Sequence, residues 1–245
     1  MAGGGERVNV VSVVNLFAGY GPYQALMDLS FSIEEGESVA IVGSNGAGKS
    51  TVARVLSGLV PISSGMATVL GCDVRVTPTH ELVRKGLIHL PEGVGLFTNL
   101  SISENIELRC RNLPRIERRQ RVEEAMEIIG SLSHRRTTLA RDLSGGQQRL
   151  VAISSAIVAR PAVLLCDEPV IGLSPVAIEG VYEVLRQAQS HGVTLLLVES
   201  RADRVQGLCS RTIVLERGQL AFDGPSNTAQ GFVANRWLKD PPRSN

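Results

Sequence analysis

The chain has 245 residues, of which 43% are hydrophobic and 20% charged, and its formal net charge is +1 at pH 7. This length suits one domain, or one domain with an inserted subdomain, and the near-neutral charge does not favour a nucleic-acid surface or an electrostatic membrane anchor. No apolar run approaches the length of a bilayer-spanning helix, and four scattered cysteines without metal-type spacing favour reduced thiols in a cytosolic compartment.

The first functional pattern in chain order is a glycine-rich loop between a predicted buried strand, residues 37–42, and a predicted helix. The loop reads Gly-Ser-Asn-Gly-Ala-Gly-Lys-Ser-Thr and matches the phosphate-binding pattern G-x-x-x-x-G-K-[ST]. Small residues let successive backbone N–H groups turn toward a phosphate, and the helix N-terminus adds partial positive charge. The apolar stripe of the helix is predicted to be Val52, Val55, Leu56 and Leu59.

This loop predicts an ATP site in which Lys49 reaches the β- and γ-phosphates and Ser50 ligates Mg²⁺. The alternative is a glycine-rich turn that precedes a lysine by coincidence. The predicted ATP-binding residues of the loop are Gly43, Ser44, Asn45, Gly46, Ala47, Gly48, Lys49, Ser50 and Thr51.

A mostly helical insert is predicted between two β-containing stretches, at approximately residues 95–160. Ser101 and Glu104 have the spacing of a capping box, which opens a helix. A later helix is predicted to bury one apolar stripe and to carry two charge pairs at i,i+4 on its solvated side. The stripe is Val122, Ala125, Met126 and Ile129, and the pairs are Glu117/Arg121 and Arg119/Glu123.

A second helix start follows at residues 143–147, which read Leu-Ser-Gly-Gly-Gln. Ser144 is predicted to cap this helix, and the two glycines permit close backbone approach to an anion. One nucleotide cannot easily use both helix starts within one monomer. The pair therefore suggests a site built across a dimer.

Two buried parallel strands are predicted at residues 162–167 and 193–199, and the first ends in Asp167 and Glu168. Asp167 is predicted to hold Mg²⁺ and Glu168 to polarise the attacking water as the catalytic base. The alternative is a solvated strand end before a proline turn. Between the strands, Ser174 is predicted to cap a helix, so strands and helices alternate as in a doubly wound α/β core.

Taken together, these motifs resemble the nucleotide-binding subunit of ABC transporters over nearly the whole chain. The resemblance implies an α/β P-loop NTPase fold, in which one ATPase domain spans residues 1–245. That fold has a RecA-like core, an N-terminal antiparallel β subdomain and the helical insert. Tyr20 matches the aromatic position that stacks on adenine; the alternative is a core or turn tyrosine.

The resemblance also implies an ATPase that uses ATP and Mg²⁺ and works as a head-to-tail dimer. Each ATP is then held between the phosphate loop of one subunit and the signature motif of the other. The signature residues are Leu143, Ser144, Gly145, Gly146 and Gln147.

The segment from Pro91 to Asn105 is similar to the second ATPase of branched-chain amino-acid importers, and urea and short-amide importers look similar. Glu92 stands where most ABC subunits carry glutamine; it can still approach Mg²⁺ but adds negative charge. Ser200 stands at the switch position, where most place a histidine that contacts the γ-phosphate. The site on this chain's own phosphate loop is therefore either slow, with a partner carrying the more competent site, or fully active.

By resemblance, the chain is expected to be a peripheral subunit at the cytoplasmic face of the cell membrane that couples ATP hydrolysis to amino-acid uptake. Its expected partners are a second ATPase subunit, identical or different, two transmembrane permeases and, indirectly, a solute-binding protein, with no nucleic acid. The alternatives are a urea or short-amide importer subunit, a soluble ABC-type ATPase, and a regulatory subunit that barely hydrolyses ATP. The soluble types carry a coiled-coil insert or two such domains, which this chain lacks.

Overall fold

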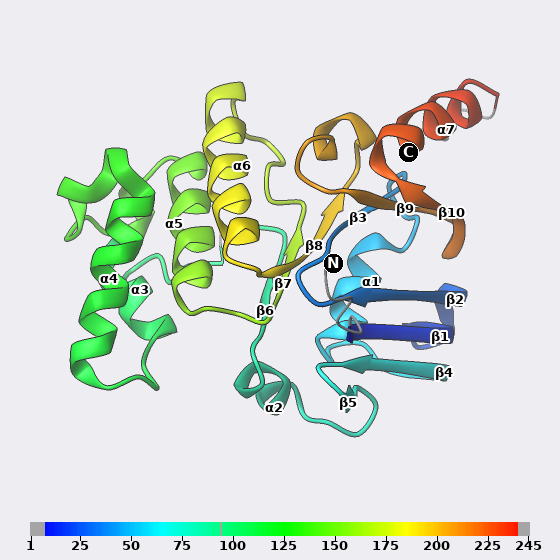
Figure 1. Cartoon of the computed structure of the whole chain (residues 1–245), viewed down its shortest axis with the longest axis horizontal. Coiled ribbons are helices and arrows are strands. Elements are labelled where there is room, and N and C mark those ends of the chain that lie inside the picture. The colour runs from blue at the N-terminus through cyan, green and yellow to red at the C-terminus, as the bar shows by residue number, and fades with distance from the viewer. Residues whose placement is uncertain (1–7, 94, 240–245) are drawn as a thin grey trace, which may run out of the picture.

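The computed structural model describes residues 8–93 and 95–239, and within them the chain forms two β-sheets and a group of helices (Figure 1). One sheet has the order β2-β1-β4-β5 and the other has the order β10-β9-β3-β8-β7-β6. The strands are β1 (Asn9–Tyr20), β2 (Tyr23–Glu34), β3 (Ser38–Val42), β4 (Ile62–Val69), β5 (Cys72–Asp73), β6 (Leu87–Leu90), β7 (Val163–Asp167), β8 (Thr194–Glu199), β9 (Arg211–Glu216) and β10 (Gln219–Pro225). The helices are α1 (Lys49–Leu56), α2 (Thr79–Arg84), α3 (Ile102–Arg109), α4 (Arg115–Ile129), α5 (Gly145–Val158), α6 (Pro175–Ser190) and α7 (Ser226–Lys239), and the short 3-10 segments are η1 (Gly130–Arg135), η2 (Ala140–Asp142) and η3 (Ala202–Val205).

The smaller sheet is antiparallel, because β1 pairs in that direction with both β2 and β4. Alternate residues of β1, among them Val11 and Val13, are buried against the core, as expected of a sheet with one covered face. This sheet is the antiparallel N-terminal subdomain that the resemblance implied.

The larger sheet is built mainly from parallel pairs, and β3 lies between β8 and β9 in it. Every residue of β3, β7 and β8 is buried, which explains why these segments are nearly continuous in apolar side chains. Because β3, β7 and β8 are mutually parallel, their carboxyl ends meet at one edge of the sheet. The predicted phosphate loop, acid pair and switch position all follow these ends.

Helix α1 packs between the two sheets and contacts strands of both (Figure 1). The predicted stripe included Leu59, but the helix ends at Leu56 and the side chain of Leu59 is 59% exposed. Gly58 has a φ of 69°, and the N–H groups of Gly58 and Leu59 donate to the carbonyls of Val55 and Arg54. These hydrogen bonds form a Schellman motif, which ends the helix at this glycine. The apolar pattern in the sequence continues to Leu59, and the pattern alone did not show that the helix ends before it.

Helices α3, α4 and α5 lie on one side of the larger sheet (Figure 1) and pack around an apolar cluster of their own, while α5 also packs on the sheet through Ile153. The capping box predicted at Ser101 and Glu104 is confirmed by reciprocal hydrogen bonds. All four residues of the predicted apolar stripe of α4 are buried, which confirms that prediction. No helix among the described residues has both the length and the apolar character needed to cross a bilayer.

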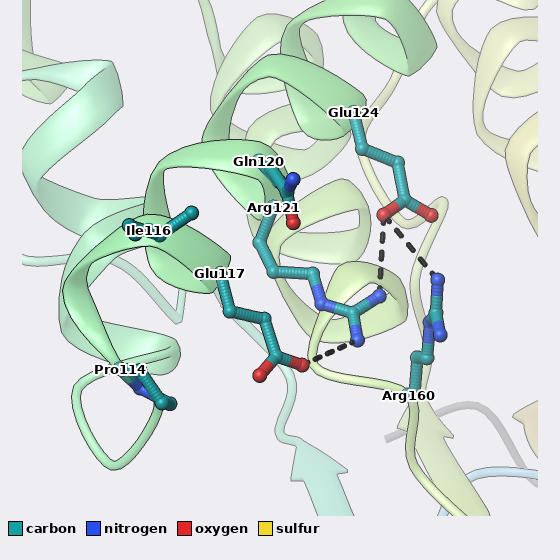
Figure 2. A pocket seen from close by; sticks show the side chains of 7 residues that line it. All are labelled: Pro114, Ile116, Glu117, Gln120, Arg121, Glu124 and Arg160. Carbon is teal, nitrogen blue, oxygen red and sulfur yellow. Dashed lines mark hydrogen bonds and ion pairs between the residues drawn. The ribbon is translucent and has the colours of Figure 1, made fainter.

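The charge pattern predicted for α4 is only partly correct. Arg121 is buried rather than solvated, and its guanidinium lies 3.2 Å from both Glu117 and Glu124 in a pocket that Figure 2 shows. Glu123 pairs at 2.7 Å with Arg136 of the following turn, instead of with the expected Arg119. Tertiary packing against the next segment therefore overrides the i,i+4 rule here.

Candidate functional site

The glycine-rich loop joins β3 to α1 and requires glycine at two positions. A Cβ at Gly43 would lie 2.5 Å from the carbonyl oxygen of Leu215, and a Cβ at Gly48 would lie 2.8 Å from that of Ala25. Gly48 also has a φ of 99°, in the left-handed region that favours glycine. The loop therefore takes a shape that presents backbone N–H groups at the start of α1, as anion binding requires.

Lys49 is the first residue of α1, and its side chain is only 5% exposed. Its Nζ donates to the carbonyl of Ser44 at 3.2 Å and lies 3.7 Å from Oε1 of Glu168. The loop and the strand end β7 are thus joined by a buried cation. This places the predicted phosphate-binding lysine beside the predicted catalytic carboxylate.

The next residue, Ser50, donates its hydroxyl to Oδ1 of Asp167 at 3.0 Å. Asp167 is 1% exposed; burial raises the pKa of its carboxyl, while the hydrogen bond from Ser50 acts in the opposite direction. Glu92 is exposed on the segment after β6 and lies within electrostatic range of Asp167. The structure therefore brings Ser50 and Asp167 into direct contact, while Glu92 is related to them only through its negative charge.

These three side chains fit Mg²⁺ by the chemistry of their donor atoms, since hydroxyl and carboxylate oxygens are the ligands that the ion prefers. Within the described residues, no group of three or more histidine, cysteine or acidic side chains could hold a metal ion. Few protein ligands are normal for Mg²⁺ at a nucleotide site, because water molecules and the phosphates of the nucleotide fill most of its coordination positions.

Glu168 follows β7 with a φ of 46°, which is uncommon for a residue with a side chain. Its N–H donates to the carbonyl of Val198 at 3.0 Å, so β8 holds the backbone in this conformation. Ser200 follows β8 and is half-buried at the same sheet edge. A fixed carboxylate beside Lys49 is suited to orienting a water molecule.

Sequence reasoning missed Glu199, which precedes the switch position and is 1% exposed. Burial raises the pKa of its carboxyl to about 7, and Arg204 and Lys49 oppose that rise while Glu168 adds to it. Its Oε1 has no hydrogen-bond partner among the described residues. The sequence does show an acidic residue at the end of an otherwise apolar strand, and this pattern could have identified Glu199.

Ser144 caps α5 as predicted, and Ser144 and Gln147 form a capping box. Ser144 and Gly145 are exposed, whereas Leu143 is buried. Helix α5 packs on the opposite face of the larger sheet from α1 (Figure 1). Within the described chain, no hydrogen bond or ion pair joins residues 143–147 to the phosphate loop, so the structure does not bring the two predicted anion sites together.

Tyr20 ends β1 and its side chain is 43% exposed, so it is not a core residue. Its hydroxyl accepts a hydrogen bond of 3.1 Å from Nη1 of Arg54 on α1. The ring is therefore tied to the helix that begins at the phosphate loop. No local sequence pattern predicted this contact, because Tyr20 and Arg54 are 34 residues apart in the chain.

Comparison with known proteins agrees with this geometry. A family model described as ABC transporter matches residues 26–171. The branched-chain amino-acid transport ATP-binding protein BraG of Pseudomonas aeruginosa is 33% identical over 90% of this chain and 94% of its own length. The lipopolysaccharide export ATP-binding protein LptB of Haemophilus influenzae is 28% identical over 89% of this chain and 91% of its own.

A solved structure gives the same result for the fold. CbiO1 of Clostridium perfringens, described as part of the ABC transporter complex cbiONQ, has a TM-score of 0.81 and 27% identity, over 96% of each chain. The fold class expected from the sequence is thereby confirmed.

Proposed function

The chain belongs to the ABC transporter family of ATPases, and we propose that it powers an importer of branched-chain or other hydrophobic amino acids by hydrolysing ATP. The proposal that the chain hydrolyses ATP rests on the cluster of side chains at the carboxyl ends of the parallel strands. There Lys49 lies 3.7 Å from Glu168, and Ser50 lies 3.0 Å from Asp167. A buried cation, a fixed carboxylate and two oxygen donors for a metal are the groups that phosphoryl transfer to water needs.

In this proposal the loop Gly43–Thr51 cradles the phosphates through its backbone, and Lys49 neutralises charge on the β- and γ-phosphates. Ser50, Asp167 and Glu92 would hold Mg²⁺, and the ion would supply positive charge to the transferring phosphoryl group. Glu168 orients the attacking water and accepts its proton. The ring of Tyr20 stacks on adenine, since it is exposed beside the helix that starts at the loop.

The proposed assembly is a head-to-tail pair of ATPase subunits, with each ATP completed by residues 143–147 of the other subunit. The separation of α5 from the phosphate loop supports it, because one chain cannot supply both anion sites to one nucleotide. We place the pair on two permease subunits at the cytoplasmic face of the membrane, with a solute-binding protein acting through the permeases. One domain spans residues 1–245, with the helical insert at approximately residues 95–160.

The amino-acid substrate rests on the similarity to BraG, whose name states branched-chain amino-acid transport. LptB matches at 28% identity against 33% for BraG, so lipopolysaccharide export is the second candidate function. The segment around Glu92 favours an importer by its resemblance to the branched-chain group. Urea or short-amide import is the alternative within the importers.

The ATPase proposal is tested with Lys49→Ala and calorimetric titration of ATP into the purified chain. We expect affinity to fall about tenfold or more, because charged hydrogen bonds contribute about 1.5–3 kcal/mol each. Lys85→Ala, at the end of α2, is the matched control and should bind like the parent. Unchanged affinity in Lys49→Ala would remove the phosphate-loop assignment.

The substrate is tested separately, by uptake of radiolabelled leucine in a strain that lacks the chain. Complementation by the parent but not by Lys49→Ala supports amino-acid import. Normal leucine uptake together with a defect in the outer surface lipid supports export instead. Normal uptake of leucine with lost uptake of urea points to the short-amide class.

A further inference from the structure

Arg149 forms a buried contact that none of the proposed catalytic roles uses. It lies in the second turn of α5 and its side chain is buried, with 5% of the residue exposed. Its Nη1 donates to the carbonyl oxygen of Pro91 at 3.2 Å. Pro91 immediately precedes Glu92, so one hydrogen bond joins the helix of the signature motif to the segment that carries a proposed magnesium ligand.

We propose that Arg149 is a positioning residue that fixes the Pro91–Glu92 segment against α5 and so holds Glu92 in place for the Mg²⁺–ATP complex. This inference rests on the proposed ATPase function. The hydrogen bond from Arg149 links the helix whose N-terminus carries the signature motif to the proposed Mg²⁺ ligand Glu92 of the same chain.

The electrostatic surroundings of Arg149 support this role. Burial lowers the pKa of its guanidinium, and Cys166, Asp167 and Glu92 act against that change. Two of these three neighbours are proposed magnesium ligands. The positive charge of Arg149 interacts favourably with both carboxylates and so offsets part of the negative charge that Glu92 adds where a neutral glutamine is usual in related subunits.

The position of the hydrogen bond between Arg149 and Pro91 allows it to pass a movement of α5 on to the Pro91–Glu92 segment. Strand β6 ends at Leu90 and the next helix begins at Ile102, so Pro91 and Glu92 lie in a connection outside regular structure. Helix α5 is capped at Ser144 and packed on the sheet through Ile153. A shift of the helix at its exposed end therefore moves Arg149, and with it the carbonyl of Pro91.

The chain offers a matched control in Arg121, a second buried arginine of the helical insert. Its guanidinium is held by Glu117 and Glu124 on α4 (Figure 2), so its hydrogen bonds lie within α4 and away from the metal side. Replacing either arginine with methionine keeps an apolar stem of similar length and removes the charge. Arg149→Met and Arg121→Met each remove a buried charge and its hydrogen bonds, but only Arg149→Met removes the contact with Pro91.

The first measurement is limited proteolysis of the full chain by a glutamate-specific protease, followed by mass spectrometry of the cut after Glu92. We expect Arg149→Met to be cut there about threefold faster or more, because an anchor of an irregular, exposed segment is lost. Arg149→Lys keeps a cation and a donor and should restore part of the protection. Arg121→Met should be cut after Glu92 at the parent rate, even where it lowers the melting temperature.

The second measurement is steady-state ATP hydrolysis of the same variants with Mg²⁺ in excess. Arg149→Met should lower kcat about tenfold with KM for ATP within about twofold of the parent, since misplacement of a ligand affects the reaction more than binding. A parent-like rate of cutting after Glu92 in Arg149→Met, or equal changes in Arg121→Met, would overturn the inference. A parent chain that neither binds nor hydrolyses ATP defeats the proposed function instead, and the rates of cutting after Glu92 then decide by themselves whether Arg149 anchors this segment.

Discussion

Lys49 and Glu168 form a buried ion pair, in which Nζ lies 3.7 Å from Oε1 and the side chains are 5% and 11% exposed. The cation proposed to bind phosphate is therefore already held by the carboxylate proposed to activate water. Phosphate that approaches Lys49 competes with this carboxylate, and a separated pair leaves Glu168 available to a water molecule. With the roles proposed for Lys49 and Glu168, this ion pair would connect nucleotide binding to the activation of water.

We predict that Glu168→Gln binds ATP more tightly than the parent while losing turnover. The amide keeps the shape but removes the charge that competes for Lys49 and repels phosphate, and it cannot accept a proton from water. Hydrolysis by the purified chain without a different partner ATPase should fall about a hundredfold or more, and size-exclusion chromatography with ATP should show a dimer, alone or with a partner ATPase.

The matched control for this variant is Glu183→Gln on α6, which removes an exposed carboxylate paired with Arg186. Surface pairs of this kind contribute little, so binding and hydrolysis should stay at parent values. Parent-like hydrolysis by purified Glu168→Gln, without a different partner ATPase, would show that another group acts as the base.

The exposed ring of Tyr20 is open to a direct test of its proposed adenine contact. We predict that Tyr20→Ala weakens ATP binding about three- to tenfold, because a stacking contact of an aromatic ring contributes about 0.5–1.5 kcal/mol. Tyr20→Phe keeps the ring but loses the hydrogen bond from Arg54, and it should bind within about twofold of the parent. Equal affinity of all three proteins would remove the adenine role.

Glu199 gives a prediction for stability against pH. Burial raises its folded-state pKa from 4.5 to about 7, so the folded protein favours the protonated form. The resulting stability is fully present below about pH 4.5 and is lost as the pH rises through about 7, by an amount of at most about 3 kcal/mol. Urea unfolding at pH 5 and pH 8 should show this loss in the parent.

The Glu199→Gln variant should lose less stability than the parent between these two pH values, since its side chain does not titrate. Its absolute stability is less informative, because the amide changes the hydrogen bonding of a buried site. If both proteins lose stability to the same extent between pH 5 and pH 8, Glu199 is not the group responsible.

Local patterns allowed much of the fold to be predicted. The capping box at Ser101 and the helix cap at Ser144 were predicted correctly because all their partners lie within one helical turn. The strands β3, β7 and β8 were recognised because buried parallel strands are apolar on both faces. Leu59 was predicted wrongly because periodicity ignores the glycine stop before it.

The contacts that assemble the site were harder to predict because their partners come from distant segments. The sequence located Lys49 and Glu168 separately but not their ion pair, and the bond from Arg149 to Pro91 has no local pattern. The burial of Arg121 likewise depends on how α4 packs. Roles that need ATP, Mg²⁺ or a partner subunit stay predictions.

Ser200 gives the last prediction. The chain keeps the phosphate loop, the acid pair and the signature motif, but serine at the switch position is too short to replace a histidine at the γ-phosphate. One missing donor to the transferring group should cost about 3 kcal/mol, or roughly a hundredfold in rate. In a dimer with a different ATPase subunit, we therefore expect hydrolysis mainly at the site that uses the partner's phosphate loop and this chain's residues 143–147.

Two variants of this chain separate the two sites, and the assay is steady-state hydrolysis by the reconstituted complex. A Cβ at Gly145 meets nothing within 4 Å, so Gly145→Asp leaves the fold of this chain intact while its carboxylate repels the phosphates of the partner's nucleotide. It should reduce turnover more than Glu168→Gln, which affects only the slower site. Adding Ser200→His should restore the missing donor, raise turnover, and make the loss from Glu168→Gln larger. The contrary result, in the complex that carries Ser200, is that Glu168→Gln reduces turnover as much as Gly145→Asp, or more. That result would show that the site with Ser200 is fully active and that the proposed asymmetry is wrong.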